Sequence, residues 1–414
     1  MNYQLFLDLA TELGYRLAIC GAETYRVEES VKRLLSAYGI PCEAYSVPYS
    51  LTVTIDTPDG TPLIRMRRIE NISSDLDAVE RYTGLSRRIC SETPDPKTAF
   101  QWLKETDQTR TYYSAPKEYL GHFLGAAGFG WFYGGSIVDA LCAGVCGLVC
   151  CAAVRLFSKL QINKFFSTII TAFLMSLPAY LLYPFGIGTN PDATIIGALM
   201  ILVPGLLFTN AMRDIIFGDT NAGIIRIVQV LLIAVSIALG TGSALSLYTA
   251  IFSTPPVSID LSHSIWIMLA ACAIGCAGFS MYFNVHGPGI LICTLGGVLT
   301  WGVYALVISW GGSEYFAYFI ASAFASLFAE IMARIRKFPA IAYLVVSAFP
   351  LLPGGGIYYT MSHAVHGDMV LFSQQGMQTV SIAGSMAVGI LLVSTFFRFL
   401  STKNQLSGNH LKNS

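Results

Sequence analysis

Ile201-Leu202-Val203-Pro204-Gly205-Leu206 places a proline and a glycine inside an apolar segment that runs from about Ala193 to Asn210. Proline removes a helical hydrogen bond and clashes with the preceding turn, so the pair predicts a break in a helix. In a membrane, such a break is tolerated only where the freed backbone groups face protein or a water-filled cavity. The stretch therefore predicts a broken membrane helix.

The same break recurs 149 residues later, in Leu351-Leu352-Pro353-Gly354-Gly355, again within an apolar segment. Paired broken helices at corresponding positions in two halves of a chain point to the binding site of a secondary transporter. The two Pro-Gly pairs are therefore the first candidates for a functional site.

Charge divides the chain into two regions. Of the 50 charged residues, 31 lie in residues 1–119, and the whole chain is 54% hydrophobic with no net formal charge. The first region has the composition of a soluble domain, whereas the rest is too apolar for one. No basic run suggests a nucleic-acid partner, and no signal peptide is recognised, so we expect the soluble region to stay in the cytoplasm.

The soluble region reads as an α+β domain. Leu5, Leu9, Leu13 and Leu17 recur at helical spacing, and a second helix is expected between Thr24 and Gly39. Strands are expected around 43–47, 51–55 and 63–67, where the hydrophobic period becomes two and Asp59-Gly60 provides a turn. Further helices are expected over 75–89 and 98–107.

Ten candidate spans follow, and the first is the weakest because it is short and rich in glycine. We place them at about 119–133, 136–154, 165–183, 193–211, 223–243, 264–283, 289–310, 315–333, 340–360 and 378–400. With the soluble region inside, all 11 basic residues of the membrane part fall on the cytoplasmic side, as the positive-inside rule requires. The acids of the opposite loops are Asp192, Asp260, Glu314 and Asp368.

The membrane part contains an internal repeat. Gly125, Gly128 and Phe129 recur 150 residues later, and Pro204-Gly205 and Gly218-Asp219 recur 149 residues later. Each copy has five predicted spans, an odd number, so the second copy should enter the membrane upside down. We therefore predict an α-helical polytopic membrane protein of about ten spans in two inverted five-helix repeats, with an N-terminal cytoplasmic α+β domain. The predicted parts are 1–115, 116–255, 256–400 and a polar, disordered C-terminal tail over 401–414.

A helix break exposes N–H groups at a positive end and carbonyl groups at a negative end. Two breaks meeting at the bilayer midplane would suit the carboxylate and ammonium of a small zwitterionic amino acid. The alternative is a packing kink in each helix. The predicted substrate-binding residues are Pro204, Gly205, Thr209, Asn210, Pro353, Gly354, Gly355 and Thr360.

Proton coupling requires a titratable group in the transport pathway. The candidates are Asp139, Asp219 and Asp368, with helix or loop capping as the alternative for each. In the soluble region, Glu23, Arg26 and Glu28 gather at one helix start and are candidates for gating or substrate contact. Their alternative is helix capping and solvated surface charge.

The ten cysteines do not form a disulfide pattern. Cys142, Cys146 and Cys150 share helical spacing, which favours a packed helix face over a metal cluster. The soluble region holds no Ser/His/Asp or Cys/His arrangement and no phosphate loop, so we expect neither enzyme activity nor a cofactor or metal. The glycine-rich stretch 121–130 suits packing within one chain or between copies in a homo-oligomer.

The chain resembles the threonine/serine exporter family. The resemblance rests on Gly21-Ala22-Glu23-Thr24-Tyr25-Arg26-Val27-Glu28, on the strand pair reaching Arg65–Arg68, and on the two Pro-Gly spans. It implies export of small neutral amino acids across the bacterial inner membrane, driven by the membrane potential or proton gradient. Both termini are expected to be cytoplasmic.

Two alternatives to this function stay open at the level of sequence. Some two-chain relatives of the family are linked to dicarboxylate export, so a succinate-type substrate is the first alternative. The second is a membrane-anchored sensor or hydrolase-like enzyme that acts through residues 1–115. The partners expected in every case are a small molecule and the lipid bilayer.

Overall fold

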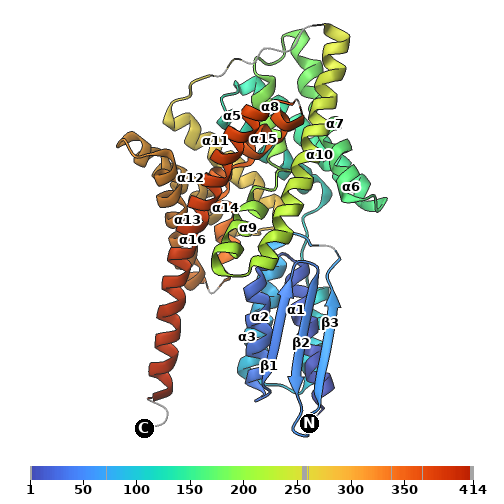
Figure 1. Cartoon of the computed structure of the whole chain (residues 1–414), viewed down its shortest axis with the longest axis vertical. Coiled ribbons are helices and arrows are strands. Elements are labelled where there is room, and N and C mark those ends of the chain that lie inside the picture. The colour runs from blue at the N-terminus through green and yellow to red at the C-terminus, as the bar shows by residue number, and fades with distance from the viewer. Residues whose placement is uncertain are drawn as a thin grey trace. The chain divides into compact units, whose positions relative to one another are not determined.

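The computed structural model describes residues 2–70, 72–253, 259, 261–336, 338–365 and 367–410. The chain forms two compact units. Unit 1 is Met1–Tyr112 with Phe283–His286 and Met332–Ala342, and unit 2 is Tyr113–Tyr282, Gly287–Ile331 and Tyr343–Ser414. Figure 1 labels the elements of both units. The charges predicted at Asp260, Lys337 and Lys412 lie outside the described residues.

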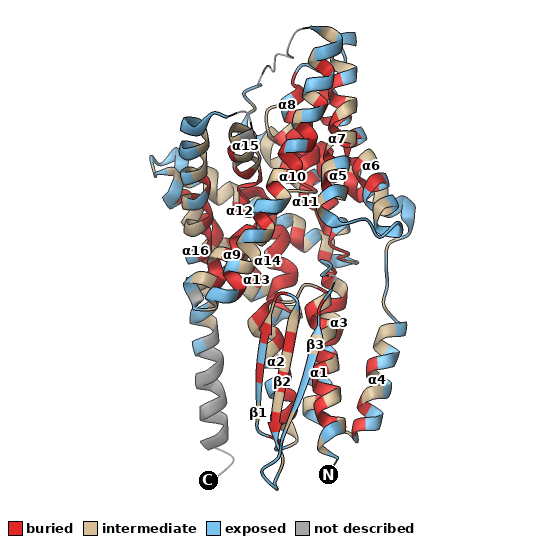
Figure 2. Cartoon of the chain, turned by 45° about the vertical axis from the view of Figure 1, so that its right-hand side comes forward, coloured by how far each residue is buried: buried red, intermediate tan, exposed pale blue. Residues whose placement is uncertain are grey.

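Unit 1 contains helices and strands within a few residues of the predicted positions. Its elements are α1 (Tyr3–Ile19), α2 (Thr24–Ala37), β1 (Cys42–Val47), β2 (Ser50–Asp56), β3 (Pro62–Arg68), α3 (Leu76–Glu92) and α4 (Pro96–Gln108). The strands form an antiparallel sheet in the order β1-β2-β3. On β2, Leu51, Val53 and Ile55 are fully buried while the residues between them are not, which is the alternation of a sheet covered on one face. Figure 2 shows this alternation along β2.

Two short segments from late in the chain belong to unit 1. The Leu76 N–H donates to the Phe283 carbonyl at 3.0 Å. The Asn284 amide donates to the Asp75 carboxylate and to the Thr111 carbonyl, both at 2.9 Å. Because these contacts join residues more than 170 positions apart, unit 1 is not a contiguous stretch of sequence.

The regular secondary structure in the described part of unit 2 is entirely helical. Its elements are α5 (Ala115–Phe132), α6 (Ile137–Lys159), α7 (Lys164–Leu182), η1 (Tyr183–Phe185), α8 (Pro191–Leu199), α9 (Gly205–Phe217), α10 (Thr220–Phe252), α11 (Ile265–Tyr282), α12 (Pro288–Ser309), α13 (Glu314–Arg336), α14 (Ala340–Ser347), η2 (Phe349–Leu351), α15 (Gly354–Val365) and α16 (Met369–His410). The last residues of α13 and the first of α14 fall in unit 1.

Seven of the described helices are long and apolar enough to cross a membrane, which makes this an α-helical membrane protein. An eighth span is obtained when α14 and the following residues to Ala364, bent by 41°, are counted together. The other two predicted spans correspond to α5, which contains Lys117, Glu118 and His122, and to the short pair α8 and α9. The count of ten therefore stays a prediction.

The C-terminal tail differs from the prediction. Instead of becoming irregular at Ser401, α16 continues to His410. No proline or glycine occurs between Phe396 and Ser407, so nothing in the sequence of that stretch ends the helix.

Helices α5 and α11 approach each other through glycines. A Cβ atom built on Gly128 would lie 2.2 Å from the Gly275 nitrogen, and one built on Gly278 would lie 2.2 Å from the Gly125 nitrogen. Position 125 faces 278 and position 128 faces 275, so the two helices run antiparallel. Backbone contact this close requires residues without a side chain, as in other close-packed membrane helices.

We expect Gly128→Ala to lower the melting temperature of the purified protein, because its Cβ would displace the α11 backbone. Gly302→Ala in α12 is the matched control, since a Cβ there meets nothing within 4 Å. In that helix alanine is favoured over glycine by about 1 kcal/mol, so the control should be neutral or stabilising. Equal melting temperatures for the two variants would contradict the α5–α11 contact.

Candidate functional site

Both predicted helix breaks are present. In the first, α8 ends at Leu199 and α9 begins at Gly205, with Pro204 in the N-cap position. In the second, α14 ends at Ser347, the short helix η2 intervenes, and α15 begins at Gly354. Proline explains both restarts, because its fixed φ suits the start of a helix while its missing N–H prevents continuation from the turn before.

The two breaks are in contact. A Cβ atom built on Gly205 would lie 3.0 Å from the Leu352 Cβ, and one built on Gly354 would lie 3.0 Å from the Val203 Cγ1. These contacts are reciprocal, since a shift of 149 positions turns 203 and 205 into 352 and 354. The structure thus brings together the Pro-Gly segments that the sequence singled out.

A buried apolar cluster continues this contact. It consists of Phe208, Val230, Ala234, Ile357 and Ala383, with Val203, Leu207, Met212 and Met361 packed against it. Phe208 and Ile357 are related by the same shift of 149 positions, as are Ala234 and Ala383. The breaks are therefore flanked by water-excluding side chains from both halves of the chain.

The other predicted binding residues lie on the helices that leave the breaks. Thr209 on α9 is 1% exposed, and its hydroxyl has no hydrogen-bond partner among the described residues. Asn210 follows it and is half-buried. Thr360 on α15 is buried, donates to the Gly356 carbonyl at 2.7 Å, and lies 3.5 Å from the Thr379 hydroxyl. Gly355 is half-buried at the start of α15.

Asp139 is buried at the start of α6 and is surrounded by donors. Its carboxylate accepts the Ser136 N–H at 2.7 Å and the Ser136 hydroxyl at 2.6 Å. The Thr189 N–H at 2.8 Å, the Thr189 hydroxyl at 3.2 Å and the Asn190 N–H at 3.1 Å complete the set. Five donors on one carboxylate form a structural cap that joins α6 to the loop before α8. Proton coupling through Asp139 stays a prediction.

Asp219 and Asp368, which are related by the same shift of 149 positions, both lie at helix starts. Asp219 precedes α10, and its N–H donates to the Asp214 carbonyl at 2.9 Å. Asp368 precedes α16, and its carboxylate accepts the Leu371 N–H at 3.1 Å. Each follows a glycine with positive φ, Gly218 at 104° and Gly367 at 80°, which ends the preceding helix. Capping accounts for Asp368, and the coupling role of both acids stays a prediction.

The gating candidates of unit 1 are engaged in local contacts. Glu23 is buried and pairs with Arg26 at 3.0 Å, and Glu28 accepts the Ser46 N–H of β1 at 2.8 Å. These contacts fix the start of α2 and attach it to the sheet. A role for the three residues in gating stays a prediction.

A charged cluster in unit 2 was missed as a site. Arg213 and Asp214 on α9 are 6% and 5% exposed. Asp214 forms an ion pair with Arg226 of α10, and Arg213 lies 3.7 Å from the same carboxylate. The sequence analysis counted Arg213 and Arg226 only among the basic residues on the cytoplasmic side. The signal that could have found them is the position of Arg213-Asp214 only eight residues after the break, within an apolar helix.

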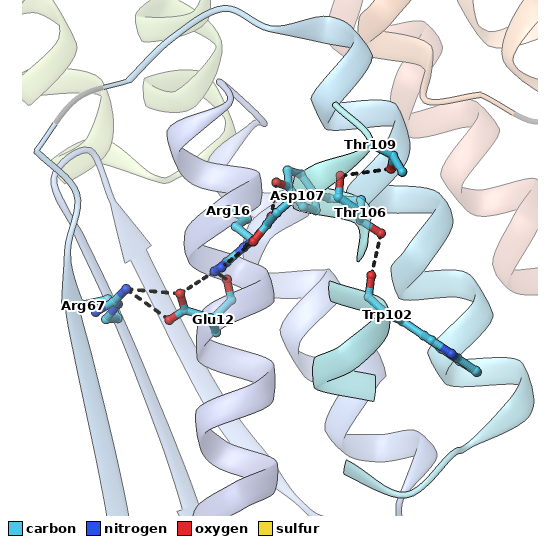
Figure 3. A network of polar contacts seen from close by, with 8 residues as sticks. Glu12, Arg16, Arg67, Trp102, Thr106, Asp107 and Thr109 are labelled. Atoms are coloured by element: carbon cyan, nitrogen blue, oxygen red, sulfur yellow. Dashed lines mark hydrogen bonds and ion pairs between the residues drawn. The ribbon is translucent and has the colours of Figure 1, made fainter. Parts of the chain in front are cut away.

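Unit 1 contains a second polar network, shown in Figure 3. The Arg16 guanidinium holds the Asp107 carboxylate at 2.8 Å and also pairs with Glu12, which pairs with Arg67 at 3.1 Å. The Tyr82 hydroxyl donates to Asp107 at 2.5 Å. Burial alone would raise the pKa of Asp107, but the hydrogen bonds from Arg16 and Tyr82 hold it below its usual value. The network cross-links α1, β3, α3 and α4.

Glu80 of α3 is perturbed in the opposite direction. Burial raises the pKa of its carboxyl to about 7, and Asp77 adds to the rise against the opposing charges of Arg81 and Arg336.

Among the described residues, no group of three or more His, Cys, Asp or Glu side chains is arranged to hold a metal ion. Cys142, Cys146 and Cys150 are buried free thiols.

We expect Asp139→Asn to lower the melting temperature, because the amide NH2 would face backbone N–H donors that the carboxylate now accepts. The loss of a buried hydrogen-bonded charge costs about 1–3 kcal/mol or more. Melting curves and the pH profile of transport are measured together. An altered pH profile with unchanged stability would instead support proton coupling through Asp139.

We expect Glu80→Gln to stabilise the full-length protein at pH 8 and to change its stability little at pH 5. A folded pKa of about 7, above the usual 4.5, means that ionised Glu80 destabilises the fold. The free energy of unfolding therefore falls as pH rises from 4.5 through 7. Thermal melts at both pH values test this. Glu70→Gln, at an exposed side chain, is the control, and an equal effect of Glu80→Gln at both pH values would contradict the prediction.

Two family models match the chain, one over each half. The family model described as "Putative threonine/serine exporter" matches residues 8–248, and the one described as "Threonine/Serine exporter, ThrE" matches residues 268–396. The threonine/serine exporter of Corynebacterium glutamicum is 22% identical over 398 residues, covering 93% of this chain and 81% of that protein. No solved structure matches the chain. With family models matching nearly its whole length, the chain belongs to the threonine/serine exporter family.

Proposed function

We propose that this protein is a secondary exporter of small amino acids of the threonine/serine class, driven by the proton motive force. The single observation that carries the proposal is the contact between the Gly205 and Gly354 breaks inside a membrane protein of this family. The match of the chain to the Corynebacterium glutamicum exporter supports this substrate class. The comparisons offer no support for the dicarboxylate or enzyme alternatives.

The substrate site is the pair of breaks. Helices α9 and α15 both begin there, so each directs the positive end of its dipole at the contact. The helices that end there, α8 and α14, supply carbonyl groups. A zwitterionic amino acid carries one group for each kind of helix end, and the apolar cluster around Phe208 and Ile357 shields the bound molecule from water.

The two halves form an inverted repeat in this proposal. The reciprocal contacts of Gly205 with Leu352 and of Gly354 with Val203 are those expected across a twofold axis. The antiparallel glycine contact of α5 with its counterpart α11 supports an axis lying in the membrane plane. Alternating access would then come from movement of one half against the other around the breaks.

The protein resides in the bacterial inner membrane with both termini cytoplasmic in this proposal, as the distribution of basic residues indicates. Unit 1 then faces the side from which substrate is taken. Glu23, Arg26 and Glu28 are the gating candidates of that unit, and Asp139, Asp219 and Asp368 are the candidates for coupling.

We expect wild-type protein in proteoliposomes to release labelled threonine and serine, but not succinate, and a protonophore to abolish the gradient-driven component. Gly205→Leu and Gly354→Leu should each reduce threonine transport at least tenfold, because the new side chains would fill the contact between the breaks. Gly302→Leu in α12 is the matched control, since that position lies outside the breaks and a Cβ there meets nothing within 4 Å.

Three outcomes would overturn parts of the proposal. Wild-type release of succinate in place of threonine would change the substrate class. Transport unaffected by a protonophore would remove the proton motive force. Normal substrate preference in both leucine variants would place the binding site elsewhere in the chain.

A further inference from the structure

A buried cluster of charge follows the first break along α9. Asp214 is held by Arg226 of α10 and lies 3.7 Å from Arg213, and all three side chains are at most 12% exposed. The cluster brings two guanidinium groups and one carboxylate together. Burying charges in this way is expensive even when they are paired, so a cluster of this kind within a membrane protein calls for a function.

A buried hydroxyl lies on the same face of α9. Thr209 is one helical turn before Arg213 and one turn after Gly205, so the three residues are successive i, i+4 neighbours. Its Oγ1 atom is buried and has no hydrogen-bond partner among the described residues. An unsatisfied buried hydroxyl costs stability, and a bound ligand would satisfy it.

The second half of the chain provides an internal control for these charges. Shifted by 149 positions, Arg213, Asp214 and Arg226 become Ser362, His363 and Gln375. Helices α15 and α16 form the corresponding junction, and no Arg–Asp pair occurs there. The charges are therefore not a requirement of packing two helices at this junction, because the same element order is built without them.

We propose that Arg213 and Thr209 form a binding site for the carboxylate of the transported amino acid, with the Arg226–Asp214 pair holding Arg213 in position. This inference rests on the proposed function. A guanidinium matches a carboxylate with two parallel hydrogen bonds, and the Thr209 hydroxyl supplies a third donor.

The position of the cluster makes it distinct from the site at the breaks. Eight residues separate Gly205 from Arg213, which is about 12 Å along a helix. The cluster therefore adds a carboxylate site further along α9 than the breaks themselves. Its absence from the second half makes the two sides of the transport pathway chemically unequal.

The test uses full-length protein in vesicles whose cytoplasmic face points outward, so that export appears as uptake of labelled threonine. We expect Arg213→Gln to raise KM for threonine at least tenfold, and Arg213→Lys, which keeps the charge, to raise it less. Thr209→Val should raise KM severalfold while leaving the melting temperature unchanged or higher, since it removes an unsatisfied hydroxyl. Threonine amide, which lacks the carboxylate, should compete poorly with threonine in the wild type.

Lys159→Gln removes the same charge from an exposed position and is the control for net charge. If wild-type protein transports threonine but Thr209→Val and Arg213→Gln keep its KM, the carboxylate site is refuted while the exporter function stands. If the wild type transports no amino acid, the proposed function fails first. Should Arg213→Gln not fold, Thr209→Val decides, because a merely structural hydroxyl would change stability without changing KM.

Discussion

Backbone polar groups have no water to bind in the hydrocarbon core of a membrane, and this constraint shapes the centre of unit 2. Each break frees N–H and C=O groups that only protein or a cavity can accommodate. The structure places the breaks against each other, with Leu352 beside Gly205 and Val203 beside Gly354. The absence of a side chain at both glycines permits this approach. One contact therefore keeps the freed backbone groups of both interrupted helices against protein.

That arrangement has a chemical corollary. Helix ends carry fixed partial charges, and here they lie beside the buried cluster around Phe208 and Ile357. The contacts between the two breaks are reciprocal, whereas the side chains around them differ between the two halves of the chain. Thr360 and Thr379 of the second half correspond to Ala211 and Val230 of the first half, and the Arg213–Asp214–Arg226 cluster belongs to the first half.

Features set by local sequence were predictable, whereas features set by distant partners were not. Period-two alternation located β2, and proline chemistry located the starts of α9 and α15. The five donors around Asp139 come partly from residues 50 positions away, so sequence alone left capping and coupling as alternatives. The burial of Arg213 was missed for a different reason: the positive-inside rule explains a basic residue near a span end without asking whether it is buried. The tail beyond Ser401 was predicted to be disordered from its polarity alone, but α16 continues through it to His410.

The contribution of Phe283 and Asn284 to unit 1 affects when that unit can be completed during synthesis. Asp75 is made early, but its partner Asn284 leaves the ribosome only after most of the membrane helices. At typical rates of translation, the 170 residues between Tyr112 and Phe283 take roughly 10–30 s. During that interval the Asp75 carboxylate lacks the hydrogen bond that Asn284 later donates. The Asp75–Asn284 contact can therefore form only once the chain has been made as far as the end of α11, the first helix of its second half.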